Sequence, residues 1–379
     1  MVLGVVSCVY PFSPEGIEEE IGVVVMEGDI NAGVVSTFTP STSIALADES
    51  GLVKALDLTT IYVESESGDK YSSFTTEESV DEHFLNRRKL SYLVDTRSLD
   101  KGKKHRLVFG ANGKTYRTGW LEFVETAPID SVTFKVAPDY ANLVVMVNAT
   151  GLNDSLMYYK WDYVEDWEFH SYYKQQVYYL RDSNQVYPIP EGQVSNYYCW
   201  NHKVSSEINI FSTEHLSQNV VINHPIRTID NEDRRISYLY AIEVHQKGLS
   251  KEAYTYWETL LKNNDGSAGI FAPQPNELRG NIFCEENPEE LVLGYISSCT
   301  VEKKRLYIDS KEHQIYRNPD KCDQQSMDQS MWKSMYDSNW DVVNIDALSG
   351  EIFWAPKKCV DCRVYGSKEK PDFWPNDHK

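Results

Sequence analysis

Cys359 and Cys362 form a C-x-x-C pair near the end of the chain, in the segment KKCVDCRVYGSKEKPDFW. Such a pair can be a redox catalyst, half of a zinc site or part of a disulfide framework. A redox pair stands at the start of a helix that follows a strand, whereas this pair lies in a segment rich in Lys, Gly and Pro. A zinc site needs four ligands, and the sequence has neither a second C-x-x-C nor an H-x-x-x-H. We therefore expect disulfides here, and neither a metal nor another cofactor.

Cys8 is a third cysteine that could carry chemistry, because it ends the segment VVSC near the start of the sequence. An aliphatic residue and two smaller ones before a cysteine are typical of a bacterial lipoprotein processing site, where the cysteine becomes the acylated first residue. The apolar stretch before Cys8 is short and lacks Lys and Arg, which indicates an incomplete signal peptide; a buried strand end is the alternative. The polar residues 13–20 suit a tether. We expect lipidation of Cys8 and assign residues 1–19 to the leader and tether.

The other six cysteines would then lie in an oxidising compartment, where an even number predicts three disulfides. They are Cys199, Cys284, Cys299, Cys322, Cys359 and Cys362. Cys284 and Cys299 flank EENPEELVLGYISS, two short apolar runs around a proline turn, so we expect a cross-strand bridge between them. For the remaining four, we expect Cys322 to pair with Cys359 or Cys362, and Cys199 to pair with the other.

The elements that must position these cysteines are predicted to be mostly strands. The 379 residues include 25 Tyr and 9 Trp, which favour strands. Short alternating runs such as TTIYVESESGDKYSSF and KLSYLVDT are separated by turn residues, which is typical of a β-sandwich. Asn112-Gly113 fits a type I′ hairpin turn, and Pro128 interrupts the pattern. We predict an all-β dominated chain, with an N-terminal β-sandwich over 20–127 and a larger β-rich domain over 128–379.

One helix is clear in the second domain. The segment LSKEAYTYWETLLKNNDG predicts a helix over 251–263, with Ser250 as the N-cap. Its apolar stripe consists of Ala253, Trp257, Leu260 and Leu261, which we interpret as core. A second helix is a candidate in SMDQSMWKSMYD, where Met327, Met331 and Met335 recur every four residues and would form an adaptable core stripe.

Aromatic residues gather between residues 158 and 179. Tyr159, Trp161 and Tyr163 alternate, so they share one face of a strand, and Trp167 follows. An exposed row of this kind could stack on sugars or peptides, whereas a buried row would be cross-strand packing. Packing is the more common role, so we favour it and keep ligand binding as the alternative.

Charge excludes several classes of partner. The chain has 37 basic and 57 acidic residues and a net charge of −20, which disfavours nucleic acid and anionic lipid surfaces. No apolar run is long enough for a transmembrane helix, so membrane attachment would need the acyl anchor.

The sequence contains no nucleophile elbow, phosphate loop or zinc-protease motif. The many carboxylates leave glycoside chemistry open without selecting a pair.

Several blocks together resemble the domain of unknown function 4249 family of Bacteroidetes lipoproteins. They are VVVMEGDI, Cys199-Trp200, HQKGLSKEAYTYWETLLKNN, GIFAPQPNELRGNIF, NPEELVLGYISS and CVDCRVYGSKEKPDFW. The resemblance implies an outer-membrane lipoprotein encoded beside a TonB-dependent receptor, with an immunoglobulin- or transthyretin-like N-terminal sandwich and no established enzyme activity. Cys199, Cys359 and Cys362 match cysteines that recur in the family, whereas Cys284 and Cys299 stand where it more often has Asn or Ser.

We therefore expect a non-enzymatic accessory lipoprotein of a TonB-dependent outer-membrane uptake system. The first alternative is a glycan- or peptide-binding surface lipoprotein that uses Tyr159, Trp161, Tyr163 and Trp167. The second is a hydrolase with unmarked carboxylates.

Overall fold

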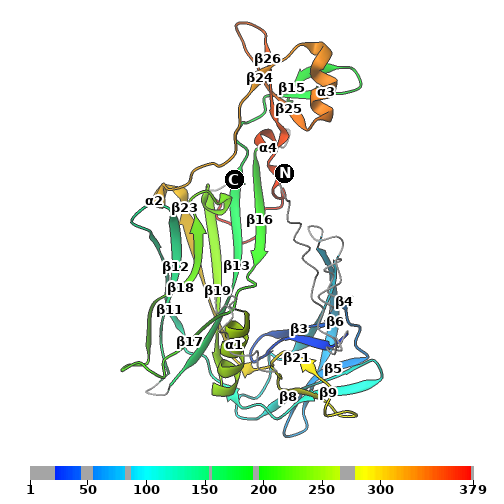
Figure 1. Cartoon of the computed structure of the whole chain (residues 1–379), viewed down its shortest axis with the longest axis vertical. Coiled ribbons are helices and arrows are strands. Elements are labelled where there is room, and N and C mark those ends of the chain that lie inside the picture. Colours follow the sequence, from blue (N-terminus) through cyan, green and yellow to red (C-terminus); the bar gives the residue numbers. More distant parts are fainter. Residues whose placement is uncertain are drawn as a thin grey trace, which may run out of the picture. The chain divides into compact units, whose positions relative to one another are not determined.

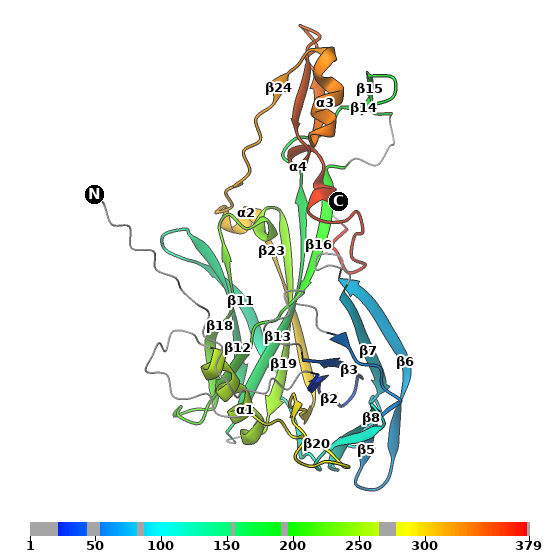
Figure 2. The same cartoon turned by 45° about the vertical axis from the view of Figure 1, so that its right-hand side comes forward.

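The computed structural model describes residues 22–43, 54–81, 87–152, 156–190, 196–264 and 278–376. Cys8 and the leader assigned to residues 1–19 lie outside these ranges. Strands dominate the described ranges, which confirms the all-β prediction (Figures 1 and 2). None of the described helices is long and apolar enough to span a membrane.

The chain forms two compact units, which we call unit 1 and unit 2. Unit 1 consists of residues 1–124 and 258–300, and unit 2 consists of residues 125–257 and 301–379. The first change of unit falls next to the boundary predicted around Pro128. Residues 258–300, however, were expected in the second domain and instead add strands to unit 1. No local turn connects these strands to their partners, so the sequence carried no signal for this return.

The main sheet of unit 1 follows the order β20-β9-β8-β5-β6-β7-β3-β1-β21, with β4 beside β3. The strands are β1 (Val24–Gly28), β3 (Val35–Thr42), β4 (Lys54–Ala55), β5 (Thr60–Ser65), β6 (Lys70–Asp81), β7 (Arg87–Asp95), β8 (His105–Ala111), β9 (Lys114–Thr118), β20 (Ile282–Cys284) and β21 (Val292–Leu293). Asn112 and Gly113 join β8 to β9 with positive φ angles of 52° and 75°, as the predicted type I′ turn requires.

Strand β6 belongs to both halves of this sheet. Its first residues pair with β5, and its remainder pairs with β7. The register shifts between Ser73 and Thr75, so Phe74 is an extra residue in the ladder. Such a bulge bends a strand and lets it pass from one layer to another. Both halves of the sheet bury their inner side chains in one core, which includes Phe38, Val63 and Phe109. The sheet therefore curves around a single core, while the more specific immunoglobulin- or transthyretin-like topology stays a prediction.

A small second sheet in unit 1 uses the returning segment. Strands β2 (Ile30–Asn31) and β10 (Phe123–Val124) each pair in parallel with β22 (Ser298–Cys299). Parallel pairs require long connections, which explains why residues distant in sequence meet here.

Unit 2 contains two sheets that share one core. The first has the order β11-β12-β18, and the second has β16-β13-β19-β23, with β17 also beside β13. The strands are β11 (Ile129–Val136), β12 (Asn142–Thr150), β13 (Tyr158–His170), β16 (Tyr198–Val204), β17 (Asn209–Ser212), β18 (Val220–Asp230), β19 (Leu239–Leu249) and β23 (Val301–Asp309). Val145 of the first sheet and Trp161 and Val244 of the second are fully buried in the same cluster. Each sheet therefore covers the apolar face of the other.

Helix α1 (Lys251–Asn264) confirms the predicted helix. The backbone N–H of Ala253 donates to Ser250 Oγ at 3.2 Å, so Ser250 caps the helix. Ala253 and Tyr256 are buried, and Lys160 Nζ lies 3.9 Å from the ring centre of Trp257. Leu261, by contrast, is 36% exposed. The buried side of α1 therefore lies nearer its start than the predicted stripe.

A small module of unit 2 is built from residues 173–190 and 321–361. It contains β14 (Val177–Leu180), β15 (Gln185–Pro188), β24 (Gln325–Ser326), η3 (Gln329–Met331), α3 (Trp332–Asp337), β25 (Trp340–Ile345), β26 (Ile352–Pro356) and α4 (Lys357–Val360), and α2 (Ser310–His313) precedes it in the chain. Its core includes Val177, Tyr179, Trp332 and Trp354. Helix α3 lies in the second predicted helical segment, but Trp332 supplies the buried contact and Met331 is 49% exposed. The expected methionine core stripe is therefore wrong at Met331.

Buried His105 of unit 1 makes stability sensitive to acid. Its side chain is fully buried, and neither ring nitrogen has a hydrogen-bond partner within the described ranges. Burial lowers the pKa of His105 below its ordinary 6.5, although Asp100 and Glu66 partly oppose the shift. The unfolded chain therefore takes up this proton more readily than the folded one. Stability from this site is complete above about pH 6.5 and is lost as the pH falls below it.

We predict that His105→Leu reduces the loss of stability between pH 7.5 and pH 5. Each pKa unit by which folded and unfolded His105 differ changes the free energy of unfolding by about 1.4 kcal/mol at low pH. Urea unfolding at both pH values measures this, with the exposed His215→Gln as the matched control. Equal pH dependence in the wild type and His105→Leu would contradict the prediction.

Candidate functional site

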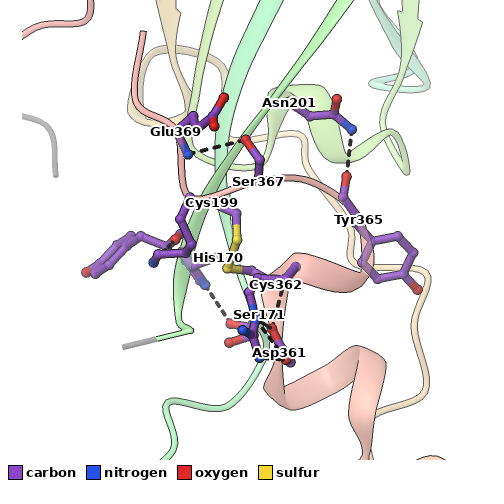
Figure 3. Close-up of a disulfide and its surroundings, with 12 residues drawn as sticks. His170, Ser171, Cys199, Asn201, Asp361, Cys362, Tyr365, Ser367 and Glu369 are labelled. Carbon is purple, nitrogen blue, oxygen red and sulfur yellow. Dashed lines mark hydrogen bonds and ion pairs between the residues drawn. A yellow bond between two sulfur atoms is a disulfide. The ribbon is translucent and has the colours of Figure 1, made fainter. Parts of the chain in front are cut away.

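Two disulfides hold the small module and its connection to the two larger sheets of unit 2. Cys322 bonds to Cys359 within the module, and Cys199 of β16 bonds to Cys362 directly after α4 (Figure 3). The Cα atoms are 5.7 Å apart in both bridges, as disulfide geometry requires. This is one of the two arrangements expected for these four cysteines.

The C-x-x-C pair is thus divided between two bridges. Cys359 lies in α4 and Cys362 in the following turn, η4 (Cys362–Val364), and each is bonded to a different distant cysteine. All four bridged cysteines are at least 92% buried. A redox catalyst would need an exposed pair that can bond internally, so the arrangement is structural.

A charged cluster accompanies the bridges at the junction between the small module and the sheets. Asp320 accepts hydrogen bonds from Arg234 and from Lys358 Nζ, the latter at 2.8 Å. The Asp320 carboxylate raises the pKa of Lys358 through this hydrogen bond. The Arg234 guanidinium lies 3.4 Å from the ring centre of Tyr365, a cation–π contact. The carboxylate thus ties η1 (Arg234–Ile236) to α4.

The cavity at this junction is small. Its volume is about 20 Å³, and its lining includes His170, Arg234, Asp320 and Tyr365. This is enough for roughly one water molecule and too little for an organic ligand. The junction is therefore a structural contact between the small module and the sheets, and not a ligand pocket.

The expected Cys284–Cys299 bridge is wrong. Cys284 lies in β20, which pairs with β9, and Cys299 lies in β22, which pairs with β2 and β10 in another sheet. The two strands are therefore not a hairpin. Both cysteines stand outside the two disulfides and are buried, and Cys284 Sγ lies 3.5 Å from a carboxylate oxygen of Glu286. Burial raises the pKa of Cys284, which keeps it protonated and unreactive.

The aromatic row also has a structural role. Tyr159 and Trp161 are fully buried, and Tyr163 and Trp167 are 2% and 8% exposed. The rings of Tyr159 and Trp161 stack with centroids 5.4 Å apart, and the indole N–H of Trp161 donates to Gln246 at 2.8 Å. The interpretation of these four residues as a ligand platform is wrong, because the shared face of β13 is turned into the core.

A buried carboxylate, Glu165, lies between Tyr163 and Trp167 on the same face of β13. Glu165 Oε1 accepts from the hydroxyl of Tyr240 at 2.8 Å and lies 3.2 Å and 3.4 Å from the Nε atoms of Arg227 and Arg235. Burial raises the pKa of Tyr240 well above 10, so it remains a hydrogen-bond donor. The network joins both sheets and η1 through one charge, and it was not anticipated from the sequence.

The exposed apolar face of the small module is the best candidate for a contact surface. Strands β14 and β15 pair so that Tyr178 lies opposite Tyr187 and Leu180 opposite Gln185. Tyr178, Leu180 and Tyr187 are 39%, 44% and 40% exposed, and we call these three side chains the hairpin face. The two tyrosine rings lie 5.8 Å apart. The opposite side of β14, with Val177 and Tyr179, packs on the module core. This hairpin is thus apolar on both sides, although one side faces solvent.

The hairpin face was missed from the sequence, although a signal was present. The segments VYYL and QVYP flank the turn RDSN, and both contain aromatic and β-branched residues that favour strands. Inspection for a hairpin would have placed Tyr178 and Tyr187 together. The chemistry these groups offer is contact and not catalysis. Within the described ranges, no group of three or more His, Cys, Asp or Glu residues is placed to hold a metal ion.

We predict that Glu165→Leu destabilises the protein by about 3–5 kcal/mol, because it removes the shared partner of two partly buried arginines. Tyr240→Phe removes one hydrogen bond and should cost about 1–3 kcal/mol. Denaturant unfolding at neutral pH measures both. A smaller loss in Glu165→Leu than in Tyr240→Phe would show that the network is not centred on Glu165.

Comparison with known proteins gives one family. A model described as a domain of unknown function, DUF4249, matches residues 9–305. The match covers the described strands of unit 1 and most of the two sheets of unit 2. No curated protein matches the chain.

Proposed function

Because the chain belongs to the DUF4249 family, we propose that it is a non-enzymatic exported lipoprotein that assists a TonB-dependent outer-membrane uptake system. Acyl chains on Cys8 would hold it at the membrane. The two buried disulfides support export, because such bridges form and persist in oxidising compartments. The hairpin face is the observation that carries an accessory, protein-binding role.

The hairpin face has the properties of an interface centre. Its two tyrosines are amphipathic and have few rotatable bonds, so they lose little entropy when they are covered. Tyr179 and Trp332 support the hairpin from its other side, and the Arg181 guanidinium pairs with Asp337 of α3 at 2.8 Å. The hairpin therefore presents Tyr178 and Tyr187 from a fixed backbone. Aromatic side chains held in this way supply most of the affinity in many complexes.

We favour a different protein, and not a second copy of this chain, as the binding partner of the hairpin face. Two copies would each carry a net charge of −20 and would repel one another. Three partly exposed side chains also fall well short of the roughly 800 Å² per partner that a stable interface buries. A receptor that contacts the hairpin face with apolar side chains, and surrounding surface with basic ones, satisfies both constraints. We assign this role to a TonB-dependent outer-membrane receptor.

We predict that Tyr178→Ser combined with Tyr187→Ser lowers the amount of co-purified receptor at least tenfold, because each aromatic anchor is worth about 1–2 kcal/mol or more. Tagged protein is captured from detergent-solubilised outer membranes, and receptors are identified and quantified by mass spectrometry. Tyr140→Ser is the matched control, since Tyr140 is 61% exposed in the β11–β12 turn. Equal capture by both variants, or capture of no receptor by the wild type, would contradict the proposed surface.

We also predict that labelled palmitate is incorporated into the wild-type chain and not into Cys8→Ser. Acyl chains provide the membrane affinity that the acidic surface opposes. Cell fractionation should therefore move Cys8→Ser from the membrane fraction to the soluble one. Incorporation that survives the substitution would exclude Cys8 as the anchor.

A further inference from the structure

We infer that this chain reaches its native disulfides by thiol–disulfide exchange and is a client of a dithiol isomerase in the compartment to which it is exported. The inference rests on the export part of the proposed function. The feature that carries it is the C-x-x-C pair, whose two cysteines are bonded to distant partners instead of to each other.

The native bridges close much longer loops than the competing local one. Cys322 and Cys359 are 37 residues apart, and Cys199 and Cys362 are 163 residues apart. Cys359 and Cys362 are neighbours across two intervening residues. Loop-closure entropy favours the local bridge by about 40-fold over the first native bridge and about 400-fold over the second. An unfolded chain exposed to an oxidant therefore closes Cys359–Cys362 first.

Contacts in the folded small module favour the Cys322–Cys359 bridge over the local Cys359–Cys362 bridge. The backbone N–H of Tyr173 donates to the carbonyl of Cys359 at 2.8 Å, and the Tyr173 hydroxyl donates to the carbonyl of Cys322. Cys322 and Cys359 are buried together with Val343 and Ala355 of the β25–β26 hairpin. These contacts exist only after β25 and β26 have paired. The correct partner of Cys359 is thus specified by tertiary structure that forms after the first oxidation.

Conversion to the native pairing requires no net oxidation. After the local bridge has formed, a second oxidation bonds Cys199 to Cys322, the other two cysteines of the native bridges. An isomerase thiolate attacks this Cys199–Cys322 bridge, bonds to Cys322 and releases the Cys199 thiolate. Cys199 attacks Cys362, which forms Cys199–Cys362 and breaks the local bridge, so that Cys359 leaves as a thiolate. Cys359 then attacks Cys322, forms Cys322–Cys359 and releases the isomerase thiolate. Two disulfides are present before and after the cycle.

Burial fixes when the exchange takes place. Cys199 and Cys359 are fully buried, and Cys322 and Cys362 are 8% and 1% exposed. An external thiolate cannot reach these sulfurs in the folded protein. Exchange therefore takes place after β25 and β26 pair and before the sulfurs are enclosed, and the finished bridges resist reductants in the absence of denaturant.

The test is oxidative refolding of the full chain with Cys8→Ser. Reduced, denatured protein is refolded either with a thiol-free oxidant or with a mixture of reduced and oxidised glutathione, then alkylated and digested with trypsin. The tryptic peptide from Cys359 to Arg363 contains both cysteines of the pair. The local bridge leaves this peptide alone, whereas native pairing links it to the peptides of Cys199 and Cys322. Cleavage before Asp361 then separates the two native bridges.

With the thiol-free oxidant, we expect the local bridge to exceed the native pairing by about tenfold or more, in line with the closure ratios. Glutathione should convert the majority to native pairing. The control Cys199→Ser combined with Cys362→Ser removes the local competitor, so Cys322–Cys359 should form equally well in both conditions.

Native pairing in the thiol-free oxidant, or a control that still requires glutathione, would overturn the inference. This assay involves neither acylation nor a receptor. Loss of palmitate labelling or of receptor capture would therefore reject the proposed function and leave the refolding result standing.

Discussion

The small module depends on a constraint of size: two segments distant in sequence must form one stable core. Residues 173–190 and 321–361 together are shorter than the roughly 70–80 residues below which a hydrophobic core alone is seldom sufficient. Covalent bridges compensate for this. Closing loops of 37 and 163 residues lowers the conformational entropy of the unfolded chain, which stabilises the folded state by at most about 4 and 5 kcal/mol. Asp320, shared by Arg234 and Lys358, adds a charged contact at the same junction. The hairpin face can stay rigid and partly exposed because the module beneath it is fastened by other means.

In both units, the residues with the most chemical promise turn out to hold the fold together. Glu165 is surrounded by Arg227, Arg235 and Tyr240, and the aromatic row of β13 fills the core. Cys284 and Cys299 are buried in strands of different sheets. The hairpin face, on the side of β14 opposite the module core, is by contrast exposed to solvent on a paired strand. The division supports a binding role, since the reactive groups are enclosed and a contact group is exposed.

Local signals made much of this fold predictable. The helix after Ser250, the turn at Asn112-Gly113 and the alternation in β13 follow from capping, positive φ and period-two patterning, which act within a few residues. For Cys199, Cys322, Cys359 and Cys362, the sequence left two disulfide arrangements, in which Cys322 bonds to one cysteine of the C-x-x-C and Cys199 bonds to the other. Alternation did not reveal which face of β13 is covered, because burial depends on the opposing sheet. The return of residues 258–300 to unit 1 uses parallel pairs of β21 with β1 and β22 with β2, and no turn sequence encodes such pairs. The Cys284–Cys299 expectation failed for that reason.

The Cys199–Cys362 bridge also determines how tension would travel along the polypeptide. It closes a covalent ring whose ends are 163 residues apart, and this ring contains β19, α1, the strands that return to unit 1, and residues 321–361 of the small module. A pull applied between the two chain termini would pass directly from Cys362 to Cys199 and bypass everything inside the ring. The load would pass through β13 and the β14–β15 hairpin, because both precede Cys199, while α3, β25 and β26 lie inside the ring and would remain unloaded. The bridge thus protects the segment between its two cysteines from tension, and it leaves the β14–β15 hairpin to respond to a pull on the chain.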